Sequence, residues 1–226
     1  MSISVEVVRV FTDANGALGN ELGIVRSSGL SRGREQQIAT ELGFSESVFI
    51  DEVAGGIATI RIFTPASELA FAGHPSVGTA WWLRDQGVTL LREKAGDVAV
   101  RTEGDVTWIT ARAPWAPEFT VHALDDAAAI DALEAESFTT GQHYAWAWSG
   151  EGAVRARMFA PAMGIVEDQA TGAAAVRLTA LLGRDLVVTQ GLGCVIRTRF
   201  LGGDLVELGG TTVADRTLRL SGGTAA

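Results

Sequence analysis

The sequence predicts an α+β protein of two pseudo-symmetric lobes, each a mixed or antiparallel sheet wrapped around a central apolar helix. Three observations lead to this fold class. Alternation of apolar and polar residues, typical of half-buried strands, recurs along the 226 residues. Two segments with a helical pattern are apolar on nearly every side, as enclosed helices are. A stretch of about twenty residues also occurs twice, once in each half of the chain.

In the first half, strands are expected around one apolar helix. Ser31 is a favoured capping residue and Gly43 a favoured helix stop, while the Gly55-Gly56 pair suits a tight hairpin. Pro75 suits the first turn of a helix. In chain order, the predicted elements are strand 3–12, a Gly- and Asn-rich loop 13–23, a strand over 23–28, helix 31–43, strands 45–53 and 57–65, an apolar helix near 75–86, and a hairpin over 98–112.

The second half repeats this composition. A solvent-facing helix with Asp at its start is expected first, because acidic residues favour helix N-termini. The predicted elements are helix 125–136, a hairpin over 143–161 turning at 149–152, an apolar helix over 171–184, and short strands over 186–191, 195–200 and 204–220.

The internal repeat relates "RIFTPASELAFAGHPSVGTA" (61–80) to "RMFAPAMGIVEDQATGAAA" (157–175). Each copy is a strand, a loop, an ionisable residue and an apolar helix, so the two helix N-termini are expected to face one cleft. The sequence divides into lobes near 1–113 and 114–226, with an approximate boundary and with crossing of the termini between the lobes left open. The aligned pairs are Phe63 with Phe159, Pro65 with Pro161, His74 with Asp168, and Gly78 with Gly172.

Composition limits the classes of function. Apolar residues make up 47% of the chain and charged residues 20%, as in ordinary globular proteins. The formal net charge is −9 without a basic stripe, which opposes a nucleic-acid-binding module and binding to anionic membranes. No apolar run approaches the ~20 residues of a membrane span. We therefore expect no nucleic acid and no membrane among the partners.

The cysteine and histidine content excludes further kinds of site. Cys194 is the single cysteine, so no disulfide forms within the chain, which suits a reducing cytoplasm. We expect Cys194 to be a small buried apolar residue. The N-terminal segment lacks the basic head and apolar run of a signal peptide. His74, His122 and His143 are scattered, and no Cys-x-x-Cys or His-x-x-x-His spacing occurs. We therefore expect a cytoplasmic protein without a metal site.

Three ionisable residues are candidates for chemistry. The first N–H groups of a helix lack intrahelical partners, so two facing helix N-termini would bind a carboxylate between His74 and Asp168. Glu46 begins an apolar strand, where partial burial would raise its pKa and suit proton transfer. Each residue also has a structural interpretation: His74 and Asp168 as helix caps, and Glu46 as an exposed charge at a strand end.

Four segments in order resemble a known family: "VFTDANGALGNELGIV", "GFSESVFI", "IRIFTPASELAFAGHPSVGTA" and "GIVEDQATGAAA". They are similar to the PhzF-like isomerases of phenazine biosynthesis, within the diaminopimelate-epimerase-like superfamily. The resemblance implies that superfamily's two-lobed fold and an isomerase without metal or organic cofactor. It implies Glu46 as proton shuttle, with His74 and Asp168 as the other catalytic residues. It assigns substrate binding to Asn20, Gly73, Ser76, Thr171, Gly172 and Ala173.

The chain also departs from relatives in this superfamily. Diaminopimelate epimerases and proline racemases use two cysteines, but the corresponding positions here carry His74 and Asp168, which excludes a two-thiol racemase. The family usually has Asp-Pro-Ala-Thr-Gly-Ser, whereas this chain has Gln169 and Ala173 in place of the Pro and the Ser. The segment before the second motif is short, which predicts a trimmed second lobe. Together with Trp-rich hairpins, this predicts a homodimer.

These observations predict an isomerase that moves a proton within a small carboxylated substrate. The alternative is a non-catalytic small-acid-binding or assembly protein on the same fold, favoured by Gln169, Ala173 and the short second lobe.

Overall fold

The structure is a computed structural model, and it describes residues 2–221. Strands alternate with few helices, as the sequence patterns predict. The first half contains β1 (Ser2–Val10), β2 (Asn20–Arg26), α1 (Glu35–Leu42), β3 (Glu46–Ala54), β4 (Ile57–Phe63), β5 (Glu68–Leu69), α2 (Gly73–Trp82), β6 (Leu90–Glu93), β7 (Gly96–Glu103) and β8 (Val106–Arg112). The second contains β9 (Thr120–Ala123), α3 (Ala127–Asp131), β10 (His143–Gly150), β11 (Ala153–Ala160), β12 (Ile165–Asp168), α4 (Gly172–Leu182), β13 (Leu186–Gln190), β14 (Cys194–Gly202), β15 (Leu205–Gly210) and β16 (Thr212–Ser221).

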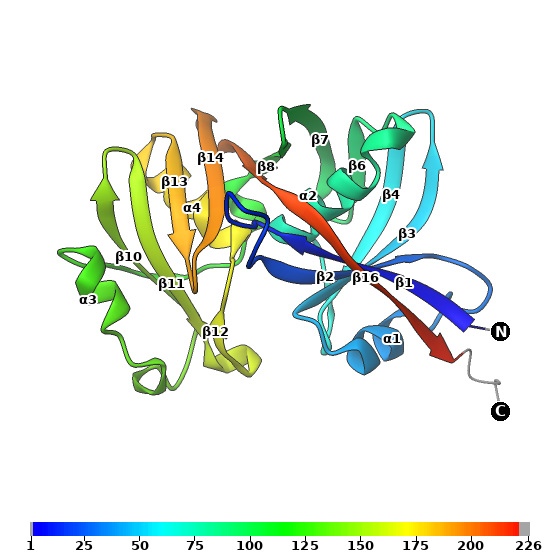
Figure 1. The fold of residues 1–226 in the computed structure, drawn as a ribbon, viewed down its shortest axis with the longest axis horizontal. Helices are drawn as coiled ribbons and strands as arrows, with labels where there is room; N and C mark the ends of the chain where they lie inside the picture. The colour runs from blue at the N-terminus through cyan, green and yellow to red at the C-terminus, as the bar shows by residue number, and fades with distance from the viewer. Residues whose placement is uncertain (1, 222–226) are drawn as a thin grey trace.

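The strands form one continuous hydrogen-bonded path. Its order is β16-β1-β2-β3-β4-β6-β7-β8-β15-β14-β13-β11-β10-β9, with β5 paired to β4 and β12 paired to β11. Figure 1 shows β10, β11, β13 and β14 on one side of the molecule and β1 to β4 on the other. The last strand, β16, returns to pair antiparallel with β1, so the two ends of the described chain lie side by side (Figure 1).

The same succession of strand pairings occurs twice. In the first half β2 and β3 are parallel, β3 and β4 antiparallel, β4 and β6 parallel, and β6 and β7 antiparallel. The second half repeats this series with β9, β10, β11, β13 and β14. The short strands β5 and β12 precede α2 and α4 in the same way. The pairing of Ser47 with Phe63 matches that of His143 with Phe159, which confirms the equivalence of the two phenylalanines.

The predicted register of the repeat is wrong beyond the strands. The two helices begin at Gly73 and Gly172, so Gly172 corresponds to Gly73 and not to Gly78. His74 then corresponds to Ala173, and Asp168 to Leu69 at the end of β5. Both helices consist largely of small residues, so their sequences match each other in several registers. The strand pairings and the helix starts are compatible with only one of these registers.

Both apolar helices are present and largely enclosed. Eight of the ten residues of α2 are buried, and six of the eleven residues of α4. In comparison, three of eight are buried in α1 and one of five in α3. Helix α2 contacts β1, β2, β3, β8, β15 and also α4. It ends at Trp82, earlier than predicted, and a separate 3₁₀ turn follows over Arg84–Gln86.

Two helix starts differ from the prediction. Ser31 does not cap α1, because its hydroxyl accepts from the Ser28 backbone N–H and the helix begins only at Glu35. The predicted helix 125–136 shrinks to the five residues of α3, although Asp126 caps it by accepting from the Ala129 N–H at 2.8 Å. Gly43 ends α1 in the left-handed conformation, as predicted.

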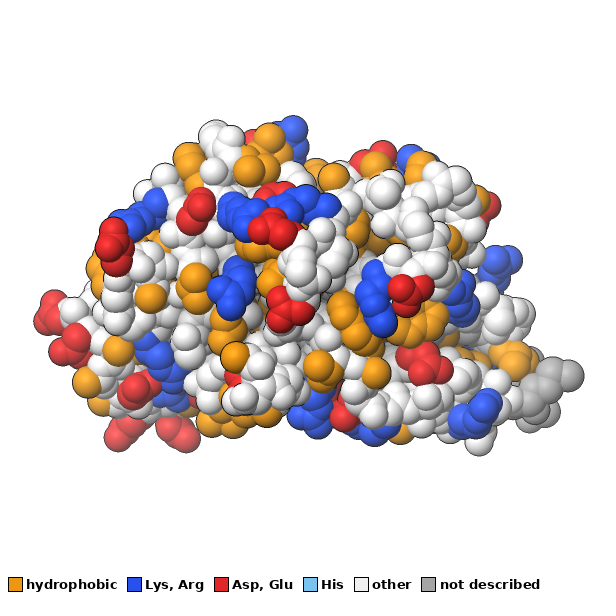
Figure 2. All heavy atoms as spheres, turned by 45° about the horizontal axis from the view of Figure 1, so that its top comes forward, with side chains coloured by type: hydrophobic (Ala, Val, Ile, Leu, Met, Phe, Trp, Pro, Cys, Tyr) orange, Lys and Arg blue, Asp and Glu red, His pale blue; other side chains and the backbone are white. Residues whose placement is uncertain are grey.

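Charged side chains join the halves of the sheet. Arg101 on β7 forms a salt bridge with Glu207 on β15, and Arg199 on β14 forms one with Glu103 on β7. Both guanidinium groups lie over the ring of Trp108 on β8, at 5.2 and 4.3 Å. On the face shown in Figure 2, basic side chains lie beside acidic ones and are not gathered in a separate patch. None of the described helices has the length and apolar character that crossing a membrane requires.

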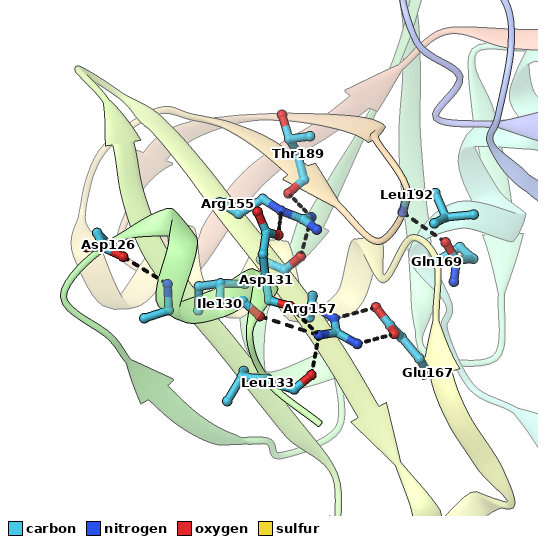
Figure 3. A network of polar contacts seen from close by, with 12 residues as sticks. Asp126, Ile130, Asp131, Leu133, Arg155, Arg157, Glu167, Gln169, Thr189 and Leu192 are labelled. Atoms are coloured by element: carbon cyan, nitrogen blue, oxygen red, sulfur yellow. Dashed lines mark hydrogen bonds and ion pairs between the residues drawn. The ribbon is translucent and has the colours of Figure 1, made fainter. Parts of the chain in front are cut away.

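Arg157 on β11 fixes the position of β12, the strand that ends in Asp168. Its guanidinium donates to both carboxylate oxygens of Glu167, at 2.9 and 2.7 Å, and to the Leu133 carbonyl at 2.6 Å (Figure 3). One arginine therefore joins β11, β12 and the segment after α3. The side chain is only 14% exposed, which reduces the screening of this pair by water.

We expect Arg157→Lys to lower the free energy of unfolding by about 1–3 kcal/mol. One ammonium group cannot replace the several N–H donors of the planar guanidinium group, so buried acceptors would be left unpaired. Urea unfolding measures this difference. The matched control is Arg112→Lys, whose pair with Asp204 is 48% and 42% exposed and should change stability by about 0–1 kcal/mol. Equal losses in the two variants would contradict this structural role of Arg157.

Candidate active site

Glu46 and His74 meet where a strand and a helix begin. Glu46 is the first residue of β3 and His74 the second residue of α2, and Glu46 Oε2 lies 3.3 Å from His74 Nδ1. The Glu46 side chain is 18% exposed and that of His74 is 4% exposed. Burial raises the pKa of Glu46; the positive form of His74 opposes this rise, and the negative charge of Asp168 adds to it. The second ring nitrogen of His74, Nε2, is buried without a partner among the described residues.

Asp168 is held by hydrogen bonds from three other elements. Its Oδ1 accepts from Asn20 Nδ2 at 2.9 Å, and its Oδ2 accepts from Thr171 Oγ1 at 2.6 Å. Its backbone carbonyl accepts from Gln190 Nε2 at 2.9 Å, and the same amide nitrogen donates to Thr171 Oγ1 at 2.8 Å. These contacts fix the orientation of the carboxylate.

Glu46 and Asp168 line one pocket of about 460 Å³. Among its described lining residues these two carboxyl groups are the only ionisable side chains, and no Lys or Arg contributes. Thr171 and Ala173 line it beside Asp168. The walls are otherwise mostly apolar: Leu69, Ala70, Phe71, Ala72, Pro114, Trp115, Ala116, Pro117, Phe119, Gln142, Met158, Met163 and Ile165. The pocket therefore combines two acids with a large apolar surface.

The N-termini of α2 and α4 meet beside this pocket. A Cβ placed on Gly73 would lie 3.0 Å from the Gly172 backbone, and one placed on Gly172 would lie 3.2 Å from Gly73 Cα. Neither helix has a side-chain hydrogen bond at its N-cap, Ala72 for α2 and Thr171 for α4, and both caps line the pocket. The positive ends of two helix dipoles are therefore directed at one small region, which favours an anion.

The structure brings together most of the predicted site residues, but not all of them face the pocket. Asn20 reaches the pocket only through Asp168, to which it donates. Gly73 and Gly172 form the contact between the helices. The side chain of Ser76 is fully buried, and its hydroxyl lies 2.8 Å from the Ala72 carbonyl and 2.5 Å from Glu93 Oε1, so it is engaged within the core.

The sequence did not reveal the roles of two glutamines. Gln190 is fully buried and joins Asp168 to Thr171, and its only signal in the sequence is the Gln190-Gly191 pair. Gln142 lines the pocket and precedes β10 by one residue. Because Ser47 and His143 are equivalent in the repeat, Gln142 occupies the position of Glu46 in the second half. Only strand register reveals that equivalence.

Comparison with known proteins identifies the family. The family described as phenazine biosynthesis-like protein matches residues 8–154 and 136–199. The trans-2,3-dihydro-3-hydroxyanthranilate isomerase of Pseudomonas aeruginosa is 32% identical over 204 residues, covering 72% of this chain and 73% of the relative. The chain belongs to the phenazine biosynthesis-like protein family. The Pseudomonas chlororaphis isomerase of the same name is 33% identical over 196 residues, covering 69% of this chain and 70% of the relative.

Solved structures of phenazine biosynthesis-like proteins share the fold. The Bacillus anthracis PhzF-family protein superimposes with a TM-score of 0.78 at 21% identity, covering 98% of this chain and 99% of the other. A hydroxyproline epimerase from Agrobacterium vitis, with bound trans-4-hydroxy-L-proline, superimposes with a TM-score of 0.63 at 12% identity, covering 97% and 92%. At these identities the comparisons establish the PhzF and epimerase-like fold alone.

The structure also locates the two departures from the family's usual motif. Gln169 Oε1 accepts from the Leu192 backbone N–H at 3.0 Å, so this residue ties the end of β12 to the turn between β13 and β14 (Figure 3). Ala173 lines the pocket where the family carries a Ser, so one hydroxyl donor is missing from the pocket wall.

Proposed function

We propose that this chain is a cofactor-independent isomerase of the PhzF type that moves a proton within a small carboxylated substrate. The single observation that carries the proposal is the environment of Glu46. Its carboxyl group faces an apolar pocket, contacts His74 and shares the pocket with Asp168. Burial raises its pKa, which makes this carboxyl group better able to take up a proton and to return it.

In this proposal, the substrate carboxylate binds at the N-termini of α2 and α4. Because the lining contains no basic side chain among the described residues, backbone N–H groups, helix dipoles and neutral donors such as Gln142 are the available partners for an anion. The apolar walls contact the carbon skeleton. The substrate lies against Glu46, which acts as the shuttle, while His74 and Asp168 orient it and adjust the proton affinity of Glu46.

The remaining expectations form part of the proposal. Asn20, Gly73, Ser76, Thr171, Gly172 and Ala173 bind or support the substrate, and two lobes, near 1–113 and 114–226, enclose the site around α2 and α4. The repeated strand pairings support two similar lobes, and the antiparallel pairing of β16 with β1 places the last strand with the first lobe. The trimmed second lobe, the homodimer and the cytoplasmic location stay predictions from the sequence.

Trans-2,3-dihydro-3-hydroxyanthranilate, the compound in the relatives' name, is the first substrate to test. The proposal predicts that the protein binds it in calorimetry and converts it at a rate proportional to enzyme concentration, followed by proton NMR. The second candidate, a small-acid-binding protein, is favoured by Ala173, which removes a donor from the pocket wall. It predicts binding and a raised melting temperature without conversion. Binding without conversion would therefore refute the isomerase.

We expect His74→Ala and Asp168→Ala to weaken substrate binding and turnover together, because both side chains hold other groups in place. Loss of a charge-assisted contact costs about 1.5–3 kcal/mol, or roughly 10- to 100-fold in kcat/KM. Steady-state kinetics and calorimetry measure the two effects. The controls are His122→Ala, on β9, and Asp125→Ala, an exposed residue outside the pocket. If kcat fell in the His74 and Asp168 variants while binding was unchanged, the orienting role would be wrong.

A further inference from the structure

Glu93 is a buried acid next to the first turn of α2, and the proposed mechanism does not use it. It ends β6, it is 6% exposed, and its Oε2 has no hydrogen-bond partner among the described residues. Its Oε1 lies 2.5 Å from Ser76 Oγ. An ionised carboxylate in such a place would be costly, because the group is buried and no cationic side chain among the described residues pairs with it.

The hydrogens around Ser76 indicate the state of Glu93. The Ser76 hydroxyl carries one hydrogen, yet it lies within hydrogen-bond distance of the Ala72 carbonyl and of Glu93 Oε1. With Glu93 ionised, one of these contacts would bring two oxygens together without a hydrogen. With a proton on Glu93, both become hydrogen bonds, since Glu93 donates to Ser76 and Ser76 donates to Ala72. Burial raises the pKa of Glu93 to about 8, although the Ser76 contact lowers it, which agrees with a neutral acid.

This chain of hydrogen bonds ends at the pocket. Ala72 is the N-cap of α2 and lines the pocket, and His74 follows two residues later. The Ala72 carbonyl also accepts from the Ser76 backbone N–H at 3.2 Å. Both the backbone and the side chain of Ser76 therefore hydrogen-bond to the carbonyl at the start of α2. The strand that bears Glu93 is tied to the same segment, because the Ala95 N–H donates to the Ala70 carbonyl at 2.9 Å.

The charged groups on neighbouring elements are engaged elsewhere. These pairs are Arg61 on β4 with Asp51 and Glu35, Glu68 on β5 with Lys94, Arg92 on β6 with Asp97 on β7, Arg101 on β7 with Glu103 and Glu207, and His74 on α2 with Glu46. Two factors therefore decide the ionisation of Glu93. Its burial opposes the charged form, and the contact with Ser76 favours it.

We propose that Glu93 is a positioning residue: as a neutral acid it fixes the first turn of α2, and with it His74 and the α2 end of the anion site, through the Ser76 hydroxyl and the Ala72 carbonyl. Its effect on turnover rests on the proposed function. Ionisation of Glu93 would withdraw the donor from Ser76 and place a negative charge behind the helix N-terminus. Alkaline pH should therefore weaken binding of an anionic substrate.

Infrared difference spectroscopy tests the protonation state without any assay of activity. The wild type minus Glu93→Gln difference should contain the carbonyl band of a protonated carboxylic acid at pH 6, and this band should disappear with a midpoint near pH 8. The control variant is Glu52→Gln, an exposed acid on β3, whose difference spectrum should lack that band at pH 6. A wild type without a protonated band at pH 6 would overturn the proposal, whatever reaction the protein catalyses.

Stability against pH gives a second readout. The folded pKa of Glu93, about 8, lies above its unfolded value of 4.5, so the folded state binds more protons between these values. Stability should therefore fall as pH rises from about 4.5 to 8, and Glu93→Gln should remove much of that decline. Unfolding curves that fall equally in both proteins would count against a neutral Glu93.

Kinetics tests the positioning role. Glutamine keeps a donor for Ser76, so Glu93→Gln should retain the wild-type KM at pH 7 and abolish its increase above pH 8. Glu93→Ala and Ser76→Ala should raise KM at every pH and lower kcat/KM by up to about 100-fold, the effect of a misplacement of about 1 Å. If KM of Glu93→Gln still increased above pH 8, Glu93 would not be the group responsible. If the wild type had no activity, calorimetric Kd values would replace KM, so failure of the isomerase proposal would stay distinguishable from failure of this one.

Discussion

Replacement of Glu46 by glutamine is expected to reduce conversion of the substrate by about 10²–10⁴-fold, the usual contribution of general acid–base catalysis. Glutamine keeps the shape of the side chain and its contact with His74, but it cannot take up and return a proton. The contact with His74 alone would lower the pKa of Glu46, so the raised pKa comes from burial in the pocket. A raised pKa suits proton transfer. Binding should stay within a few fold of wild type, since backbone groups hold the substrate carboxylate.

The measurement is kcat by proton NMR beside Kd by calorimetry. The control is Glu52→Gln, which removes an exposed carboxylate from the same strand, β3, outside the pocket. Near-normal turnover in Glu46→Gln would remove Glu46 from the mechanism. Normal turnover in the control together with a large loss in Glu46→Gln would locate the effect in the pocket rather than in β3.

Gly73→Ala is expected to disrupt both stability and binding. The new methyl group would lie 2.6 Å from Leu208 Cδ2 and 3.0 Å from the Gly172 backbone. The leucine can move, but the backbone of the facing helix cannot do so without separating the two N-termini. Overpacking of this kind costs about 1–3 kcal/mol of folding free energy. A separation of about 1 Å between the N-termini would add a loss of about 100-fold in kcat/KM.

Gly172→Ala should behave in the same way, because its methyl group would meet Leu208 at 2.8 Å and Gly73 Cα at 3.2 Å. Gly29→Ala is the matched control, since nothing lies within 4 Å of a methyl group there. Urea unfolding and substrate titration measure the two losses. Wild-type affinity in a folded Gly73→Ala protein would contradict the view that the two helix N-termini together form the anion site.

Much of the architecture follows from local patterns. The hairpin between β3 and β4 turns at Gly55 and Gly56, which both have positive φ, and Gly183 ends α4 in the left-handed conformation. Such features depend on one or two residues, so a single sequence reveals them. Glu46 and Asp168 could likewise be assigned to one pocket, because the motifs around them resemble those of the PhzF-like family.

Features that depend on three-dimensional pairing could not be predicted in this way. The register of the repeat, and with it the equivalence of Gln142 to Glu46, is set by strand pairing across the sheet. The direction of the Ser76 hydroxyl is set by Glu93 on β6, seventeen residues later. A weak signal for Glu93 did exist: Leu91 and Glu93 share one face of β6 by alternation, and Leu91 is fully buried. Alternation indicates which face is buried, but not which partner lies there.

Incorporation of solvent deuterium tests the central claim most directly, namely that Glu46 moves a proton within the substrate. The wild-type protein would convert trans-2,3-dihydro-3-hydroxyanthranilate in heavy water, and mass spectrometry with NMR would locate deuterium on carbon in the product. Because the Glu46 side chain is 18% exposed, its acid proton exchanges with solvent, and we predict carbon-bound deuterium in the wild-type product. A bound compound that gains no carbon-bound deuterium, whether or not it is converted, would contradict proton transfer through Glu46.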